Sequence, residues 1–595
     1  MKPTQKLVEI RNMMAASGID AYFIPMTDPH MGEYVPDRWK TIQWLTGFTG
    51  SAGNVIITND FAGLWTDSRY FLQAEDQLEN SGFELVKLMV PHTPEFIDWL
   101  EENLDQGASL AFDGEVVSTG ISNMFSDRLS PVGIKINSEV DLCSGLWTNR
   151  PPIPSGMIYE HDVEYAGLTR TEKIEQIREE MRQEGVSYHV LTSLDDIAWT
   201  FNIRGRDVNY SPLVIAYAVI SLKDTWLFMN VDKIPELLGN KLLNDKIKIL
   251  DYDWVYEFLK SIKAGSTVFI SQASLNTRLY NSIVSVCRIK NGISIPTSLK
   301  SIKNSVELGH IDKVMVKDGV ALSRFFYWLE QNIGKEKITE LSASIKLEEF
   351  RMEQDNFMGP SFATIAGYKG HGAIIHYEPT IETDIPLEPD GIFLLDSGGQ
   401  YLDGTTDTTR TVSLGNPGRE EMRDFTLVLK GTIQLAMTRF PQGTKGYQIE
   451  AFARRALWDY GMNYGHGTGH GVGFFLNVHE GPQTIGSAAS GNRDIPLEPG
   501  MLISDEPGVY KEGKYGMRTE NLVVVEKSNK TEFGEFNKFK TVTLCYIDTQ
   551  LIDIELLLPD EKEWLNEYHK RVFREISPFL NKNEKKWMEG KTQPV

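Results

Sequence analysis

The segment IFLLDSGGQYLDGTTD (392–407) carries an acidic residue near each end of what we predict to be one β-ribbon. Asp396 ends the apolar run 392–395, and Asp407 follows beyond an Asp-Gly pair that is typical of a hairpin turn. An antiparallel ribbon would deliver both carboxylates to one place. A single acidic residue is usually a solvated turn or N-cap residue, so the prediction depends on what accompanies this pair.

Three further residues of metal-ligating type follow in local sequences suited to rigid presentation. His470 lies in the glycine-rich string HGTGHGVG (466–473), where missing side chains let the backbone bend sharply or approach a ligand. Glu506 lies in SDEPG and Glu520 in MRTEN, each beside residues typical of strands. Four carboxylates and one imidazole form an oxygen-rich set that suits Mn²⁺, Mg²⁺, Co²⁺ or Fe²⁺ better than a thiolate-bound structural zinc. Two cations about 3.5 to 4 Å apart could hold and activate one hydroxide.

The ordered string D-x10-D, HGTGH, DEP and RTEN resembles the M24 metallopeptidases with the pita-bread fold, and within them the aminopeptidase P (Xaa-Pro aminopeptidase) family. Segments along nearly the whole chain resemble its long, three-domain, cytosolic type: GFTGSAG (47–53), TDSRYFLQA (66–74), SLDDIAWTFNIRG (193–205), AIIHYEP (373–379) and NVHEGP (477–482). The resemblance implies a multidomain chain of α/β and α+β class, in which two related N-terminal α/β (creatinase-N-like) domains precede a pita-bread catalytic domain.

The resemblance also implies a site with two divalent metal ions, of which we favour Mn²⁺, with Zn²⁺, Co²⁺ or Fe²⁺ as alternatives. The implied ligands are Asp396, Asp407, His470, Glu506 and Glu520. Glu506 would also act as general base and proton shuttle. The other implied roles are oxyanion stabilisation and carbonyl binding by His479 and His376, lining of the proline pocket by His466, orientation of carboxylates by Arg518, and substrate contact by Arg69.

The implied reaction releases the N-terminal residue from peptides with proline in second position. Prolidase, an Xaa-Pro dipeptidase, shares the metal set and is the nearest alternative, but the additional upstream domain argues against it. Creatinase shares the fold without the metals, and a peptidase-like binding module would have a dead pocket. Both are disfavoured because all five ligands and the histidines are present. His371 matches none of these motifs, so we expect an ordinary hydrogen-bonded imidazole there.

Composition limits the partners and the compartment. The 595 residues include 82 acidic and 60 basic residues, for a formal charge of −22, which disfavours nucleic acid as a partner. The start MKPTQKLVEI has no apolar signal region, and no apolar stretch is long enough to span a membrane. Cys143, Cys287 and Cys545 are far apart beside apolar residues and are expected to be buried thiols. We expect a cytoplasmic enzyme that acts on peptides and, by analogy with the family, forms a homodimer.

An internal repeat organises the first half. KLVEIRNMMAASGIDAYFI (6–24) aligns without a gap with KIEQIREEMRQEGVSYHVL (173–191), and each copy predicts an amphipathic helix, a C-terminal glycine and a strand. Trp44 and Trp199 fall at similar stages of the two copies. The proline-rich stretch 147–156 marks the first boundary. We therefore expect domains at 1–155, 156–308 and 309–595.

The third domain is expected to open with a helix over 310–334, and a second helix over 447–460 should stop just before the histidine string. A C-terminal extension should begin at about 540 and contain a helix near 559–580. The polar stretch 582–595 is expected to be loosely held.

Overall fold

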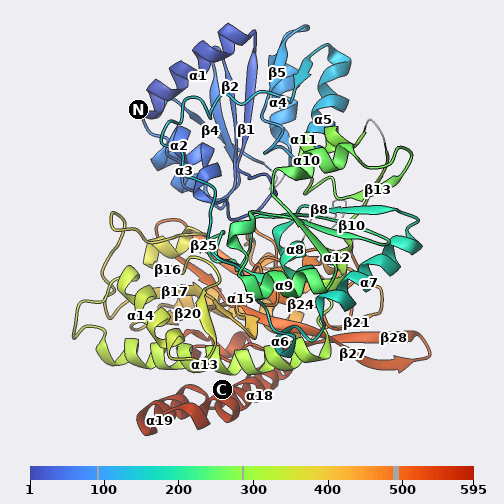
Figure 1. The fold of residues 1–595 in the computed structure, drawn as a ribbon. Coiled ribbons are helices and arrows are strands. Elements are labelled where there is room, and N and C mark those ends of the chain that lie inside the picture. Colours follow the sequence, from blue (N-terminus) through green and yellow to red (C-terminus); the bar gives the residue numbers. More distant parts are fainter. Residues whose placement is uncertain (90–92, 285–286, 487–494) are drawn as a thin grey trace. The chain divides into compact units, whose positions relative to one another are not determined.

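The structure is a computed structural model that describes residues 1–89, 93–284, 287–486 and 495–595. The chain divides into two compact units (Figure 1). The first comprises residues 1–161 and 168–296, and the second comprises residues 162–167 and 297–595. The domain boundaries expected at 155 and 308 stay predictions.

The first unit contains two mixed six-stranded sheets with the same strand order. In each sheet one central strand pairs antiparallel with the strand on one side and parallel with the strand on the other. The first sheet has the order β4-β3-β2-β1-β5-β6: β1 Ala21–Pro25, β2 Asn54–Thr58, β3 Ala62–Thr66, β4 Glu84–Lys87, β5 Ser109–Ala111, β6 Lys135–Asn137. The second has the order β12-β11-β10-β8-β13-β14: β8 Tyr188–Leu191, β10 Tyr217–Ser221, β11 Thr225–Phe228, β12 Ile247–Leu250, β13 Thr267–Ile270, β14 Arg288–Asn291.

The repeat predicted from sequence is confirmed at the level of single hydrogen bonds. Lys6 donates to the carbonyl oxygen of Trp44, and its counterpart Lys173 donates to that of Trp199 at 3.0 Å. Each ammonium also lies over the indole ring, 4.8 Å and 4.5 Å from the ring centroid. The glycines that end the two repeat helices both adopt left-handed backbone, with φ of +65° and +68°. The two α/β modules therefore share one internal design.

Helices flank these sheets. The repeat helices are α1 (Pro3–Ser17) and α7 (Arg170–Gln183). The others in this unit are α2 Thr41–Thr46, α3 Phe71–Gln77, α4 Glu95–Asn103, α5 Thr119–Leu129, α8 Leu194–Phe201, α9 Glu236–Asn244, α10 Trp254–Lys260 and α11 Thr277–Val284. A short ribbon pairs β7 (Tyr159–Glu160) with β9 (Ile203–Arg204). Helix α12 (Ile295–Ser301) leads into the second unit.

The second unit is built from antiparallel ribbons flanked by helices. The strands are β15 Phe357–Pro360, β16 Ile365–Tyr368, β17 Ile392–Ser397, β18 Gly399–Tyr401, β19 Gly404–Thr405, β20 Thr408–Ser413, β21 Arg439–Pro441, β22 Gly469–His470, β23 Thr484–Ile485, β24 Leu502–Asp505, β25 Gly508–Lys511, β26 Tyr515–Arg518, β27 Asn521–Thr531 and β28 Gly534–Thr541. They pair as β15-β18-β19, β16-β17-β20, β21-β28-β27-β24, β22-β23 and β25-β26. Two related α/β modules followed by this mixed unit agree with the predicted fold class.

The second unit's helices include ones close to the spans expected at 310–334, 447–460 and 559–580, and others that were not predicted from the sequence. They are α6 Val163–Ala166, α13 Ser305–Asn332, α14 Glu340–Met352, α15 Arg419–Ala436, α16 Gly446–Ile449, α17 Ala451–Trp458, α18 Pro559–Ile576 and α19 Lys582–Lys591. Helix α13 starts earlier than expected because Asn304 caps it, its side chain accepting from the N–H groups of Val306 and Glu307. The single helix expected over 447–460 is two helices, α16 and α17.

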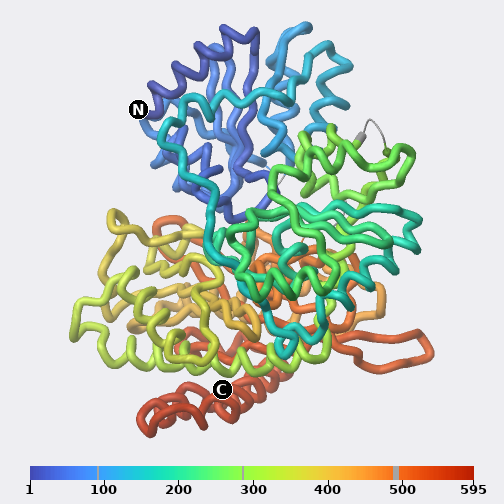
Figure 2. The backbone as a smooth tube through the Cα atoms, in the orientation of Figure 1, coloured from blue at the N-terminus to red at the C-terminus, as the bar shows by residue number. Residues whose placement is uncertain are grey.

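The expectation of a loosely held tail is wrong. Residues 582–591 form α19, which packs with α18 against α13 (Figure 2). Asn581 and Glu584 form a capping box, and the side chain of Met588 is fully buried. The tail is held because a few apolar residues on one helical face enter the core.

Two further expectations concern cysteines and membranes. The three cysteines are free thiols, but only Cys143 and Cys545 are buried, whereas Cys287 is half-buried on the short connection before β14. Of the helices in the described residues, none is both long and apolar enough to cross a bilayer.

Candidate metal centre

The predicted ribbon exists and presents both of its acidic residues to the same region. Strand β17 pairs antiparallel with β20 in a register that places Asp396 opposite Thr409. Asp407 directly precedes β20, and both carboxylates are buried. The buried apolar residues 392–395 anchor β17 in the core, so the backbone that carries the side chain of Asp396 is held in place.

The glycines of the histidine string allow close approach of other backbone segments. A Cβ atom on Gly469 would lie 1.9 Å from the carbonyl oxygen of Ser504, and one on Gly471 would lie 2.1 Å from that of Glu480. No side chain fits there, so β22 can lie against the segment that leads to Glu506. His470 is thereby held between two backbones, its N–H donating to Oγ of Ser504 at 2.9 Å.

Ligand atoms of Asp407, His470 and Glu520 all lie within 4.8 Å of one another. Nε2 of His470 is 3.5 Å from Oδ2 of Asp407 and 3.6 Å from Oε1 of Glu506. These four side chains come from three ribbons and from positions far apart in the sequence. The structure thus brings an imidazole and three carboxylates into one buried cluster.

Crowded negative charge shapes the proton affinity of this cluster. Burial and the negative charges of Asp407, Asp396 and Glu506 raise the pKa of Glu520 well above its ordinary value. Burial also raises the pKa of Glu506 to about 7, although His470 and Arg518 act in the opposite direction. Burial alone would lower the pKa of His470, but Asp407 and Glu506 outweigh it and raise that pKa to about 9. Buried carboxylates in mutual repulsion are stabilised by a cation.

Arg518 is the cation that the chain itself supplies. Its guanidinium donates to Oδ2 of Asp396 at 2.5 Å, to Oγ1 of Thr409 at 3.0 Å and to the hydroxyl of Tyr510 at 2.6 Å. Thr409 in turn donates to Oε2 of Glu520 at 2.8 Å. Arg518 therefore contacts Asp396 directly and Glu520 through the hydroxyl of Thr409, and its role in orienting these carboxylates stays a prediction.

His479 contacts a member of this cluster, and His466 contacts Tyr510, a partner of Arg518. The ring of His479 meets that of His470 edge to face, with centroids 4.3 Å apart. Nε2 of His466 lies 2.8 Å from the hydroxyl of Tyr510, which Arg518 also contacts. His376 is half-buried on the loop after the 3-10 turn η4 (Lys369–Ala373). This turn packs against the hairpin β25-β26, from which Tyr510 and Arg518 project.

Arg69 and His371 have local partners. Arg69 lies in the first unit, where its Nε and Nη2 atoms donate to the two carboxylate oxygens of Asp67 at 2.8 and 2.7 Å. His371 lies beside the buried carboxylate of Glu340, with Nδ1 at 3.0 Å from Oε2. It is the hydrogen-bonded imidazole that we expected. The substrate contact expected of Arg69 stays a prediction.

Sequence reasoning missed three residues that support the cluster: Thr409, Ser504 and Tyr510. The hydroxyl of Ser504 accepts from the N–H of His470 and donates to Oε1 of Glu506 at 3.2 Å, so it links two predicted ligands. A signal for Thr409 was present, because it lies two residues after Asp407 in a strand rich in polar residues and so shares a face with that carboxylate. The partners of Ser504 and Tyr510 are distant in sequence, and no local pattern pointed to them.

The residues present fit a pair of hard cations. Oδ1 of Asp396 is buried and, within the described residues, has no hydrogen-bond partner, although the opposite oxygen is held by Arg518. An unsatisfied buried carboxylate oxygen is costly unless a ligand completes it. The donor set contains four carboxylates, one imidazole and no thiolate, which suits oxygen-preferring divalent ions.

Family models match almost the full chain. The model for metallopeptidase family M24 matches residues 309–527, and the model for the C-terminal region of peptidase M24 matches 535–595. Two models for a creatinase/prolidase N-terminal domain match residues 6–139 and 149–307. Among curated relatives, the protein named probable Xaa-Pro aminopeptidase P from Coprinopsis cinerea is 38% identical over 100% of this chain and 98% of its own length.

Solved structures give a consistent picture. The crystal structure of X-prolyl aminopeptidase from Caenorhabditis elegans, described as a cytosolic enzyme with a di-nuclear active site, matches with a TM-score of 0.95. It is 33% identical, and the match covers 100% of both chains. An Xaa-Pro dipeptidase from Bacillus anthracis matches with a TM-score of 0.51 at 21% identity, over 64% of this chain and 99% of its own, which shows likeness of fold alone.

Proposed function

The chain belongs to metallopeptidase family M24 and is a metal-dependent Xaa-Pro aminopeptidase, and from this premise we propose how its residues carry out the reaction. The substrate class is peptides with a free N-terminus and proline in second position. The observation that carries the proposal is the convergence of Asp407, His470 and Glu520, with ligand atoms within 4.8 Å, in a chain that aligns end to end with a di-nuclear relative.

We assign the cation ligands as five side chains. These are Asp396, Asp407, His470, Glu506 and Glu520, and among the candidate ions we favour Mn²⁺ over Zn²⁺, Co²⁺ and Fe²⁺ because carboxylates predominate. When bound, the two cations would lower the pKa of a water molecule and polarise the scissile carbonyl. The rest of the mechanism concerns what the chain's own groups do.

Glu506 is the group we assign to proton transfer. Its Oε1 is held by the hydroxyl of Ser504 at 3.2 Å and lies 3.6 Å from Nε2 of His470. Hydrolysis adds a hydroxyl group to the carbonyl carbon and breaks the C–N bond, and the departing proline nitrogen must gain a proton because it carries no hydrogen in the peptide. A carboxylate that takes the proton of water and passes it to that nitrogen completes the balance.

The histidines are assigned to the substrate. His479, beside His470, and His376, on the loop after η4, would donate to the carbonyl oxygen as negative charge develops on it. His466 would line the pocket for the proline ring, with its imidazole oriented by Tyr510. Arg69 is also assigned to substrate contact. A pocket that reads ring shape is required because a proline peptide bond offers no N–H to grip.

A dipeptidase is the alternative that the same metal set allows, and the fit to the dipeptidase fold leaves about a third of this chain outside the match. Peptides beginning Arg-Pro-Pro distinguish the two. An Xaa-Pro aminopeptidase releases free arginine from them, whereas a dipeptidase acts only on Arg-Pro itself. Each peptide should be assayed with Mn²⁺, with Zn²⁺ and with a chelator, because activity that survives chelation would contradict the metal assignment.

An N-terminally acetylated copy of the same peptide is the matched control. Acetylation removes the charge and the donors of the amine, so it should abolish cleavage. Equal cleavage of both forms would point to an endopeptidase. We further propose that the enzyme works in the cytoplasm, by likeness to the cytosolic nematode enzyme, and that it forms a homodimer. Sedimentation of the purified chain tests the second of these proposals.

A further inference from the structure

The guanidinium of Arg410 on β20 is buried and uses every donor it has. Nε donates to the carbonyl oxygen of Tyr546 at 2.9 Å, and Nη1 donates to those of Thr409 at 2.9 Å and Glu520 at 2.6 Å. Nη2 donates to Oδ1 of Asn521 at 2.8 Å, the carbonyl oxygen of Cys545 at 2.8 Å and the hydroxyl of Tyr568 at 2.9 Å.

These acceptors belong to three segments of the chain. Thr409 lies on the same strand as Arg410. Glu520, the assigned ligand, and its neighbour Asn521 form the second segment. Cys545, Tyr546 and Tyr568 belong to the C-terminal region. All of the acceptors are neutral, so the charge is not compensated by a carboxylate among them. A buried cation held by neutral groups is costly to desolvate, which makes it a poor device for stability alone.

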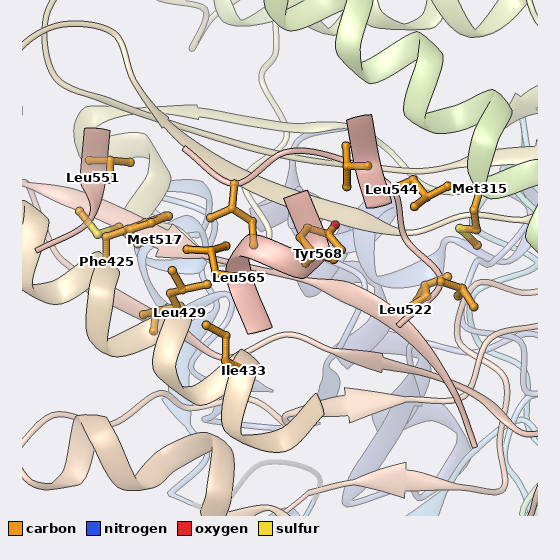
Figure 3. Close-up of a cluster of buried hydrophobic side chains, with 14 of the residues drawn as sticks. Met315, Phe425, Leu429, Ile433, Met517, Leu522, Leu544, Leu551, Leu565 and Tyr568 are labelled. Carbon is orange, nitrogen blue, oxygen red and sulfur yellow. The ribbon is translucent and has the colours of Figure 1, made fainter. Parts of the chain in front are cut away.

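Tyr568 on α18 connects this cluster to the C-terminal core. Besides accepting from Arg410, its hydroxyl lies 2.9 Å from the carbonyl oxygen of Cys545 and 3.3 Å from Oδ1 of Asn521. Its ring is stacked on Trp564, with centroids 5.2 Å apart. Figure 3 shows Tyr568 beside Leu565 of the same helix, within the buried cluster that also contains Leu544 and Leu522.

The consequence for Glu520 is that its backbone and side chain are both fixed from β20. The N–H of Glu520 donates to the carbonyl oxygen of Thr409 at 3.2 Å, and its own carbonyl oxygen accepts from Arg410. Its Oε2 accepts from the hydroxyl of Thr409 at 2.8 Å. Arg410 is in turn held by residues 545–568. The position of this carboxylate thus depends on a region outside the strands that carry the site.

We propose that Arg410 and Tyr568 are positioning residues, through which the C-terminal segment from Val542 to Ile576 sets the place of Glu520 and thereby the affinity of the site for divalent cations. The inference rests on the proposed assignment of Glu520 as a ligand. Groups that orient metal ligands typically contribute about 10- to 100-fold to metal affinity.

Tyr568→Phe tests this with the smallest change, since it removes one oxygen and keeps the ring on Trp564. The metal-free chain is titrated with Mn²⁺ and the dissociation constants are compared with those of the unaltered chain. We expect Mn²⁺ binding to weaken about 10-fold, with kcat at saturating Mn²⁺ close to the unaltered value. Arg410→Gln should weaken binding further in the same direction, and Tyr568→Phe keeps the test valid if that variant does not fold.

Val572→Ala is the matched control. Val572 is fully buried on the same helix and is not part of the hydrogen-bond network, so its truncation loosens α18 without touching Arg410. It should leave Mn²⁺ affinity unchanged. If Val572→Ala weakens Mn²⁺ binding as much as Tyr568→Phe, or if Tyr568→Phe leaves binding unchanged, the positioning role is wrong.

A readout without metal separates this inference from the assignment of the ligands. Hydrogen exchange in the metal-free chain should speed up at residues 518–521 in Tyr568→Phe and not in Val572→Ala. If the unaltered chain bound no Mn²⁺, the proposed ligand set would fail. If it bound two ions, and neither exchange nor affinity responded to Tyr568→Phe, only the positioning role would fail.

Discussion

The imidazole rings of His470 and His479 meet edge to face, with centroids 4.3 Å apart and planes inclined by 84°. His470 is an assigned cation ligand. This geometry therefore puts His479, nine residues later in the sequence, at the edge of the cation site. The close backbone approach at Gly471, where a Cβ would lie 2.1 Å from the carbonyl oxygen of Glu480, folds the intervening segment back. We therefore propose that His479 acts on the substrate carbonyl without binding a cation.

His479→Ala should lower kcat by about 10² to 10³, the usual cost of one oxyanion donor, and leave metal content intact. The loss should be equal in kcat and kcat/KM, because the contact is made chiefly in the transition state. Steady-state kinetics at saturating Mn²⁺ measure both. A raised KM with unchanged kcat would make His479 a substrate-binding residue, and lost metal would make it a support of the site.

Asp407→Asn and Glu520→Gln should each abolish turnover and lower metal content. Each change keeps the size of the side chain but removes a negative charge, so two neighbouring cations would repel each other with less compensation. Elemental analysis after gentle purification gives the metal count. Asp403→Asn is the control, since Asp403 is buried on the same ribbon but pairs with Lys317 at 2.7 Å. Two metals retained in either ligand variant would show that the assignment is wrong.

The ribbon formed by β17 and β20 (392–413) illustrates what the sequence could and could not predict. The paired strands and both acidic residues followed from local pattern, because a hairpin signal and an apolar run act over a few residues. Asp407, Thr409 and Thr411 share one face by the alternation of a strand. The hydroxyl of Thr409 donates to the carboxylate of Glu520, 111 residues away in the sequence. The hydroxyl of Thr411 donates to the carbonyl oxygen of Arg518, 107 residues away. Such pairings depend on tertiary contact, and local periodicity carries no information about them.

The C-terminal tail shows the opposite case. A local signal for a helix was present in the sequence, but the polar composition of the stretch outweighed it in the prediction. The stretch 582–595 is polar and charged, which favoured a loose end. Asn581 and Glu584, however, have the spacing of a capping box, and they start α19. Trp587 donates to Glu330 and Met588 is buried, so the helix is held by one narrow face. The mean polarity of the stretch does not reveal an apolar helical face as narrow as this one.

Glu480→Gln should destabilise the chain by about 3 to 5 kcal/mol, because it leaves buried positive charge without its partner. The carboxylate of Glu480 is fully buried, in contact with Lys303 and 3.3 Å from Nζ of Lys300. Asp312→Asn breaks an exposed pair with Lys540 and should change stability by less than about 1 kcal/mol. Thermal unfolding of the two variants side by side measures the difference, and equal effects would contradict the prediction.

His189 should make the first unit sensitive to acid. The imidazole is buried, with Nδ1 at 3.1 Å from the carbonyl oxygen of Phe269 and Nε2 accepting from the N–H of Ile295 at 3.2 Å. Burial lowers the pKa of His189 from 6.5 to about 4. Between about pH 4 and pH 6.5, His189 therefore binds a proton in the unfolded chain but not in the folded chain. The contribution of the neutral His189 to the free energy of unfolding is fully present above pH 6.5 and is lost as pH falls towards 4. Between pH 7 and pH 5 this loss is about 2 kcal/mol.

His189→Gln tests the cause, because an amide can still donate to Phe269 and accept from Ile295 but has no proton to gain in this range. Its unfolding temperature should fall less than that of the unaltered chain when pH drops from 7 to 5. Both proteins are measured with chelator present, so that loss of metal from the second unit does not contribute. The comparison within one pH range also cancels the titration of all shared groups. Identical pH dependence in the two proteins would mean that the buried imidazole takes up a proton without unfolding the sheet around it.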